Sequence, residues 1–295
     1  MNCFQLVNTV LTDLYEEIAS EYGARTDKTI KERLDQLYEY YGKSGSRIKV
    51  SFSDPVTRFA YIFLYTTAHA NYVYNIISTS PVLQNVFDTK VLEASCIGGG
   101  PGSDLLGILK YLNLHYTSDQ LCSLMCYLCD KEKAWRESWC DVGSKLDADF
   151  PCSVHTFSWE LDVFDEDELV SHRKIFGADF FTMIYFFSDP EIFDAKEDAR
   201  TFFEYWFAKA KPGALFLFID NAAWKFYSWF DDMAAQGGLE TVEKEDHVHI
   251  LINWQEEKRD LGIYFEKFGD PKIQSDIAYR VYRKPCEEDD DLDDW

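Results

Sequence analysis

A glycine-rich turn between two apolar segments constrains the fold of this chain more than any other feature. Residues 91–104 read VLEASCIGGGPGSD, and a helix-like apolar run continues over residues 105–114. Glycine has no Cβ, so a ligand can approach the backbone closely, and the helix N-terminus that follows presents free N–H groups. The segment therefore predicts a strand–turn–helix unit that binds a nucleotide-like ligand.

The spacing within this turn argues against two common nucleotide signatures. A P-loop requires Lys and then Ser or Thr after its last glycine, whereas Gly102 is followed by Ser103 and Asp104. The dinucleotide fingerprint G-x-G-x-x-G, started at Gly98, would need a third glycine where Ser103 stands. The turn instead reads G-x-G-x-G over Gly98, Gly100 and Gly102.

Downstream of residue 89 the chain alternates apolar, strand-like segments with helical ones. The expected strands are 91–96, 121–129, 154–161, 180–187 and 214–219, and the expected helices are 103–114, 131–145, 190–209 and 222–236. Apolar strands separated by helices are typical of a parallel sheet covered on both faces. Residues 247–254 and 277–283 are expected to add a terminal antiparallel pair, joined by a polar insertion. The predicted class is α/β, a doubly wound, mostly parallel seven-stranded sheet with an N-terminal helical extension and an antiparallel terminal strand.

Three regions follow from this patterning. Residues 1–85 carry apolar stripes at helical spacing and are expected to form a helical lid or partner surface. Within them, Asp54-Pro55 predicts a helix start, since Asp favours the N-cap and Pro the first helical position. Residues 86–285 are expected to form the ligand-binding domain. Residues 286–295 contain seven acids and are expected to be a disordered tail, with docking of a basic partner as the alternative.

The composition limits which cellular compartment and which partners we expect. The 295 residues are 46% hydrophobic and carry a net charge of −23. An acidic body repels phosphate backbones, so nucleic acid is not the favoured partner. Eight cysteines without a basic, apolar leader predict a cytoplasmic or nuclear protein with reduced thiols. The most apolar window, 59–77, is interrupted by polar residues and is expected to be a buried helix rather than a membrane span.

The turn and three later segments resemble the class I, seven-stranded S-adenosylmethionine-dependent methyltransferases. Asp130, after the second strand, matches the family's ribose-binding acid, Asp162-Val163 matches the pair beside the adenine, and KPGAL at 211–215 matches the entry to the fifth strand. The resemblance covers roughly residues 90–284 and implies that S-adenosylmethionine is the cofactor. The implied cofactor-binding residues are Gly98, Gly99, Gly100, Gly102, Asp104, Asp130, Asp162, Val163 and Phe187.

One position departs from the family pattern. The family carries an acid two residues before the first glycine of the turn, and this chain has Cys96 there. Glu93 lies too early on the strand to replace that acid, so Asp104, just past the turn, is the candidate to take over part of its role. The departure implies either weaker cofactor binding or a turn that is held differently.

The methyl acceptor is expected at the ends of the first, fourth and fifth strands. Amino-group methyltransferases often carry an Asx/Ser-Pro-Pro-aromatic motif after the fourth strand, but Ser188-Asp189-Pro190 is followed by an acid. Ser188 and Asp189 are therefore catalytic candidates by location only, and a helix N-cap is the alternative. Tyr65 and His69, one helical turn apart, are further candidates, with a packed core pair as the alternative. Asp220 and Asn221 share the same edge.

No metal site is expected. Cys129 points to the opposite side of its strand from Cys122 and Cys126, and a closed tetrahedral site needs a fourth ligand. His247 and His249 share one strand face without a third ligand in view.

The favoured function is methyl transfer from S-adenosylmethionine to an unidentified acceptor, a protein or small molecule rather than RNA. The alternatives are a catalytically weak cofactor-binding subunit or sensor that acts through protein interactions, and an RNA methyltransferase. A nicotinamide- or flavin-dependent oxidoreductase is a third class. No membrane partner is expected.

Overall fold

The computed structural model describes most of the chain. The described residues are 2–42, 48–115, 121–138, 146, 150–167, 173–252 and 256–286. The acidic stretch 287–295 and residues 139–145 of the expected helix 131–145 lie outside them.

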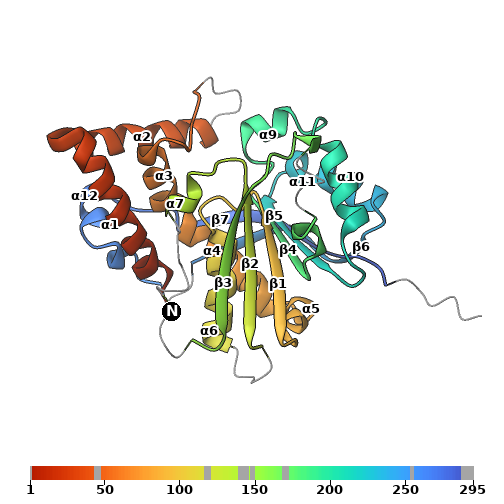
Figure 1. Cartoon of the computed structure of the whole chain (residues 1–295). Coiled ribbons are helices and arrows are strands. Elements are labelled where there is room, and N and C mark those ends of the chain that lie inside the picture. The colour runs from red at the N-terminus through yellow and green to blue at the C-terminus, as the bar shows by residue number, and fades with distance from the viewer. Residues whose placement is uncertain are drawn as a thin grey trace, which may run out of the picture.

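Seven strands of the described residues form one sheet in the order β3-β2-β1-β4-β5-β7-β6 (Figure 1). Strands β1 to β5 run parallel, while β7 is antiparallel to both β5 and β6. This arrangement confirms the predicted mostly parallel, seven-stranded α/β fold. The strand order reverses between β1 and β4, which makes the carboxyl edge there the expected ligand crevice. The strands are β1 Val91–Ile97, β2 Ser123–Asp130, β3 Ser153–Glu160, β4 Phe180–Ile184, β5 Leu215–Asn221, β6 Glu240–Leu251 and β7 Gln274–Arg283.

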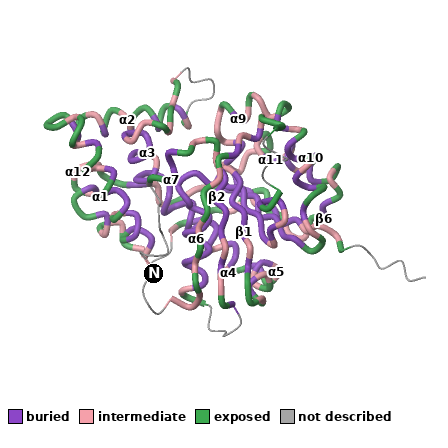
Figure 2. The backbone as a smooth tube through the Cα atoms, in the orientation of Figure 1, coloured by how far each residue is buried: buried purple, intermediate pink, exposed green. Residues whose placement is uncertain are grey.

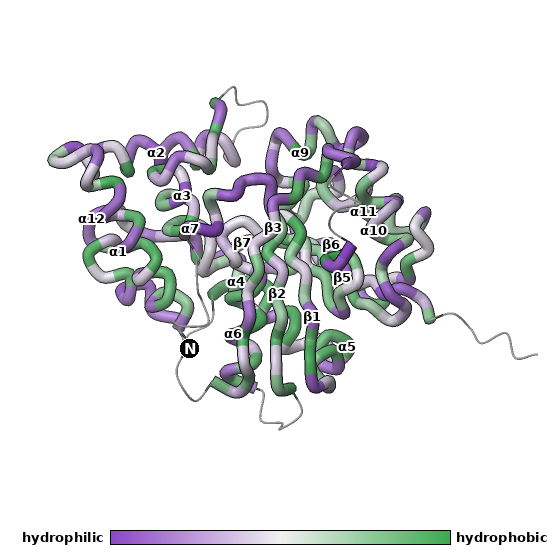
Figure 3. The backbone as a smooth tube through the Cα atoms, viewed as in Figure 1, coloured by the Kyte–Doolittle hydropathy of each residue, from purple (hydrophilic) through white to green (hydrophobic). Residues whose placement is uncertain are grey.

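Helices cover both faces of the central strands, which are mostly buried (Figure 2). One face packs against α4 (Thr67–Thr79) and α6 (Ser103–His115), and the other packs against α10 (Arg200–Lys209) and α11 (Trp224–Gln236). The central strands carry hydrophobic residues on both sides for this reason (Figure 3). The edge strand β3 instead alternates between exposed and half-buried residues.

The N-terminal region is helical, as expected, and shares one hydrophobic cluster with the sheet. Its first helix begins after Asn2, whose side chain accepts a hydrogen bond from the N–H of Phe4. Asp54 caps α3 with Pro55 at its first position, which confirms the predicted helix start. The helices of this region are α1 Cys3–Tyr22, α2 Thr26–Gly42, α3 Pro55–Tyr61 and α5 Pro81–Gln84, with short 3₁₀ turns at Gly23–Arg25 and Asn85–Phe87.

A fully buried ion pair ties this region to the sheet domain. Lys110 Nζ donates to Glu256 Oε1 at 2.5 Å and to Asn71 Oδ1 at 2.7 Å. The other carboxylate oxygen of Glu256 accepts the N–H of Cys3 at 2.8 Å. Since a buried charge needs a full set of partners, this cluster fixes how α1, α4 and α6 lie relative to one another.

The helix expected to run from residue 55 to residue 77 is interrupted by a π turn at Ile62–Thr66. A π turn leaves backbone groups outside the regular ladder. The C=O of Leu64 accepts the N–H of Lys272 at 2.9 Å, which anchors the segment that leads into β7.

Three other elements differ from expectation. The fourth strand ends at Ile184, because Tyr185 has a positive φ of 54° that no strand accommodates. The expected helix 190–209 is split into α9 Pro190–Asp194 and α10, and in the described part of 131–145, residues 131–138, the helix is α7 Trp135–Ser138. The insertion 255–274 holds a 3₁₀ turn, Lys258–Leu261, and α12 Ile263–Phe268, where Leu261 and Tyr264 are buried. No described helix is both long and apolar enough to cross a membrane.

Candidate functional site

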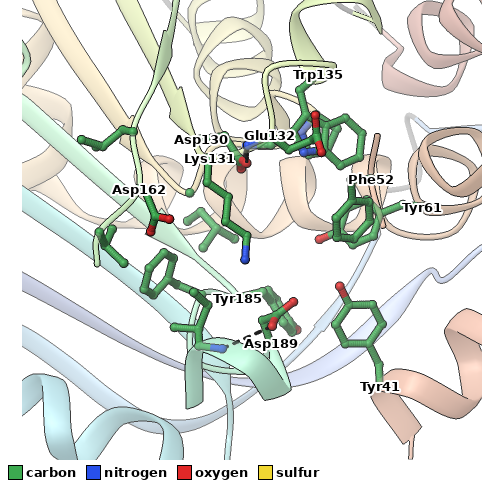
Figure 4. A pocket seen from close by; sticks show the side chains of 18 residues that line it. Tyr41, Phe52, Tyr61, Asp130, Lys131, Glu132, Trp135, Asp162, Tyr185 and Asp189 are labelled. Atoms are coloured by element: carbon green, nitrogen blue, oxygen red, sulfur yellow. Dashed lines mark hydrogen bonds between the residues drawn. The ribbon is translucent and has the colours of Figure 1, made fainter. Parts of the chain in front are cut away.

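The glycine turn opens into a cavity at the carboxyl edge of the sheet, here called the glycine-turn cavity (Figure 4). It measures about 120 Å³ and is lined by the turn, by Asp130 and Trp135, and by Asp162 and Val163. Gly98, Gly100 and Gly102 have φ of +66°, +39° and +72°, which residues with a Cβ rarely adopt. These glycines are therefore required by the turn itself. Gly99 and Gly102 do not line the cavity, but the N–H of Gly102 closes the turn on the C=O of Gly99.

Asp130 lies at the end of β2 with its carboxylate beneath the glycine turn. Its Oδ2 accepts the N–H of Gly100 at 3.0 Å, and its Oδ1 accepts the N–H of Glu132 at 2.9 Å. Each carboxylate oxygen can accept two hydrogen bonds, so both retain a lone pair for a ligand. Burial raises the pKa of Asp130 to about 6, so the carboxylate is ionised at neutral pH. A Cβ at Gly100 would lie 3.5 Å from Asp130 Oδ2 and fill part of this cradle.

The other end of the cavity is a mostly apolar slot beside the end of β3. Leu161 and Val163 form one side, and Phe186 and Ile192 line the same cavity. Asp162 lies among them and accepts the N–H of Phe164 at 3.0 Å. A flat apolar slot with one carboxylate suits a heteroaromatic ring that bears an amino group.

Aromatic rings from distant segments close the cavity on the side of the N-terminal helices (Figure 4). The Phe52 and Trp135 rings lie 5.1 Å apart, and the Tyr61 ring lies 5.8 Å from Trp135. Tyr41, at the end of α2, lies 6.1 Å from Tyr61. Sequence reasoning missed these residues, because no motif marks them and only tertiary packing brings them together.

Asp104 is buried under the turn rather than exposed in the cavity. It lies in the first turn of α6 and accepts a hydrogen bond from Thr182 Oγ1 at 2.6 Å, and it is 3% exposed. Burial raises its pKa to about 7. Cys96 is also buried, with its Sγ 3.6 Å from that of Cys126 on β2. The position that the family fills with an acid is therefore a sulfur contact in the core here, and the nearby acid is Asp104.

A second, larger cavity adjoins the first and is here called the tyrosine chamber. It measures about 550 Å³. Tyr41, Tyr61 and Tyr185 line both cavities, so they form the junction. Tyr185 holds the positive φ noted above, and its hydroxyl donates to Ser275 Oγ at 3.0 Å. Strained backbone of this kind clusters at ligand sites.

The catalytic candidates lie around these cavities. Tyr65, His69 and Ser188 line the tyrosine chamber, whereas Asp189 lines the glycine-turn cavity. Asp189 also caps α9, as the alternative interpretation predicted. Phe187 lines neither cavity and packs in the core beyond the sheet. Its neighbour Phe186 lines the glycine-turn cavity instead.

Asp220 supports the chamber wall from behind. Its carboxylate accepts the N–H of Phe187 at 3.0 Å, the N–H of Ser188 at 3.1 Å and a short hydrogen bond from Ser188 Oγ. Asn221 Nδ2 donates to Ser188 Oγ at 2.6 Å. The Ser188 hydroxyl thus both donates and accepts a hydrogen bond within the protein, which gives it a structural role in the chamber wall.

Burial sets the ionisation of the chamber. The pKa of His69 lies well below its usual value because of desolvation and of the nearby Lys272, so the imidazole is neutral. Burial raises the pKa values of Tyr65 and Tyr185, which stay protonated. Burial also lowers the pKa of Lys272 to about 8.

Within the described residues no group of three or more His, Cys, Asp or Glu side chains is placed to hold a metal ion. Cys126 and Cys129 lie in opposite face clusters of the sheet, as their strand spacing predicts. His249 Nδ1 instead lies 2.8 Å from Asp276 Oδ1.

No family model matches the chain, and no curated protein matches it in sequence. Solved structures do match. An O-methyltransferase family protein from Burkholderia thailandensis gives a TM-score of 0.50 at 13% identity, over 91% of this chain and 75% of that chain. An S-adenosylmethionine-dependent methyltransferase from Methanosarcina mazei gives a TM-score of 0.43 at 10% identity, over 70% of this chain and 99% of that chain. A precorrin-6y C5,15-methyltransferase from Geobacter metallireducens gives a TM-score of 0.41 at 10% identity, over 70% of this chain and 86% of that chain.

The chain has the seven-stranded, Rossmann-like fold of the class I S-adenosylmethionine-dependent methyltransferases. The resemblance stated from the sequence is thus confirmed at the level of the fold.

Proposed function

We propose that the protein is an S-adenosylmethionine-dependent methyltransferase in which the glycine-turn cavity binds the cofactor and the tyrosine chamber binds the acceptor. The observation that carries this proposal is the junction of the two cavities at Tyr41, Tyr61 and Tyr185. Ligands of open α/β sheets bind at this carboxyl edge. Methyl transfer needs donor and acceptor aligned in contact, and two cavities with a shared wall provide that alignment.

The residues of the glycine-turn cavity have complementary roles in cofactor binding. Asp130 would accept the ribose hydroxyls, and Asp162 and Val163 would hold the adenine ring. S-adenosylmethionine, when bound, supplies a methyl group on a positively charged sulfur. The ring faces of Tyr41 and Tyr61 would attract that charge by about 0.5–2 kcal/mol. Asp104 would support the turn from below, in place of the acid missing at residue 96.

His69 is the proposed proton acceptor in the chamber. Transfer of a methyl group to a hydroxyl or amine releases a proton, and a neutral imidazole can accept it. His69 lines the chamber and is held against Tyr185 with ring centroids 4.1 Å apart. Its lowered pKa keeps it ready to accept a proton at neutral pH.

A protein or small-molecule acceptor suits this chain better than RNA. A net charge of −23 repels a phosphate backbone, so an RNA acceptor would need a basic partner or a local basic surface.

Calorimetry with S-adenosylhomocysteine tests the cofactor site. We expect saturable binding by the wild type and at least tenfold weaker binding by Asp130→Asn, because hydrogen bonds to a charged group contribute about 1.5–3 kcal/mol. Asp232→Asn is the matched control, since this exposed acid on α11 does not line the glycine-turn cavity. Absence of saturable binding by the wild type would refute the proposal.

A cofactor-binding subunit without catalysis is the second candidate, and the buried Cys96 in place of the family's acid favours it. Labelling of a cell extract with tritiated S-adenosylmethionine separates the two, once RNA, protein and small molecules are fractionated. Label in one fraction supports the enzyme and identifies the acceptor class. Cofactor binding with no label in any fraction supports the subunit.

A further inference from the structure

The tyrosine chamber differs in charge from the rest of this acidic protein. Among the described residues that line it, Lys272 alone carries a formal charge, and none is Asp or Glu. The other polar lining groups are tyrosine hydroxyls, the neutral His69, Ser188 and Asn221. The chamber is therefore a cationic site in a chain with a net charge of −23.

Lys272 has no carboxylate partner among the described residues. Its ammonium group lies 5.0 Å from the ring centroid of Tyr185 and 5.9 Å from that of Tyr65. The nearest acid acting on it is Asp220, whose carboxylate already accepts hydrogen bonds from Phe187 and Ser188. A half-buried ammonium without a counter-ion is costly unless a ligand supplies the negative charge.

The backbone holds Lys272 in place. Its N–H donates to the C=O of Leu64 in the π turn at 2.9 Å, two residues before β7 begins. The same π turn carries Tyr65. The π turn thus holds the backbone of Lys272 and also carries Tyr65, one of the two rings near the Lys272 ammonium group.

The walls of the chamber are largely aromatic. The His69 and Tyr185 rings lie parallel, with 6° between their planes, and the Tyr65 ring stacks on His69 at 20°. A volume of about 550 Å³ fits a small organic molecule. Aromatic walls beside one unpaired cation suit an aromatic ligand with a negative charge, because Lys272 attracts a carboxylate and repels an ammonium or guanidinium group.

We propose that the acceptor chamber binds an aromatic small molecule that carries a carboxylate, with Lys272 as the partner of that carboxylate. This inference rests on the methyltransferase function proposed above and names its acceptor class. It also disfavours a lysine or arginine side chain as acceptor, although the acidic surface of the protein alone would favour a basic protein.

Binding of three probes of one shape tests the inference. The probes are 2-naphthoate, the neutral 2-naphthamide and the cationic 2-naphthylmethylammonium, titrated by calorimetry at pH 7 with S-adenosylhomocysteine present. Four proteins are compared: the wild type, Lys272→Met, Lys272→Arg and the control Lys209→Met, an exposed lysine at the end of α10. Thermal unfolding of each protein confirms folding, and its S-adenosylhomocysteine affinity is measured separately.

We expect the wild type and Lys209→Met to bind 2-naphthoate at least tenfold more tightly than 2-naphthamide. Lys272→Met should lose this preference, and Lys272→Arg should keep it. Equal binding of the anionic and neutral probes, tighter binding of the cationic probe, or an unchanged preference in Lys272→Met would overturn the inference. Failure of S-adenosylhomocysteine alone to bind would instead refute the cofactor proposal, because the naphthoate preference is measured on a different cavity.

Discussion

Replacement of the buried Asp104 by Asn should change how the stability of the protein depends on pH. Burial raises the pKa of Asp104 to about 7 in the folded protein, against an ordinary value of 3.8. The folded state therefore binds more protons than the unfolded state between these two values. Stability falls with rising pH wherever the folded state binds more protons, so the contribution of Asp104 is present at low pH and lost as pH rises toward 7.

The size of this effect follows from the pKa. One pH unit within this window is worth about 1.4 kcal/mol, and about two units separate pH 5 from the folded pKa near 7. As the pH rises from 5 to 8, the ionisation of Asp104 should therefore lower the free energy of unfolding by roughly 3 kcal/mol. Asn cannot ionise but can still accept the hydrogen bond from Thr182. The free energy of unfolding of Asp104→Asn should therefore not include this decrease with rising pH.

Urea unfolding of the wild type and of Asp104→Asn at pH 5 and pH 8 measures the difference. Asp130 and Asp220, with pKa values raised to about 6 and 7 by burial, add losses of the same sign in both proteins. We expect the variant to be closer to the wild type at pH 5 and clearly more stable than it at pH 8. An equal stability difference at the two pH values would refute the reasoning, because Asp104 would then not titrate in this range.

Three further predictions concern packing, charge and chemistry. Gly107→Ala places a Cβ 2.5 Å from a carbonyl oxygen of α4 and should lower the free energy of unfolding by about 1–3 kcal/mol, whereas Gly177→Ala, with open space around it, should not change it in the same urea titration. Glu256→Ala leaves Lys110 buried without its partner and should cost about 3–5 kcal/mol, and a loss below about 1 kcal/mol would show that the pair is not buried in solution. His69→Phe should slow methyl transfer about 100-fold in a radiolabel assay while S-adenosylhomocysteine binding persists, and an unchanged rate would remove His69 as the proton acceptor.

The local parts of the site could be predicted from the sequence because they follow from short-range rules. The glycine turn needs positive φ at fixed spacing, and Asp130 and Asp162 stand directly at strand ends. The mostly parallel sheet and the antiparallel terminal pair followed from the apolar pattern and the family resemblance.

The walls of the two cavities could not be predicted, for two physical reasons. Phe52, Trp135 and Lys272 come from segments far apart in the chain, and only tertiary packing brings them to the site. The left-handed backbone at Tyr185 ends the strand three residues earlier than expected. Phe186 lines the cavity, whereas Phe187, which the sequence assigned to the cofactor site, packs in the core. Alternation rules assume an unbroken strand, and a single positive φ removes that assumption.

The π turn at Ile62–Thr66 sets the rotational phase between two stretches of one helix. A π turn holds one residue more than a regular turn, and each residue of an α-helix turns the chain by about 100°. Deletion of a single residue there would restore a regular helix but rotate α4 by that angle relative to α3. His69 would then leave the chamber, and the face of α4 that packs on Gly107 would turn with it. The inserted residue thus rotates α4 relative to α3, so that one continuous helix contributes to the aromatic wall at one end and packs on the core of the sheet at the other.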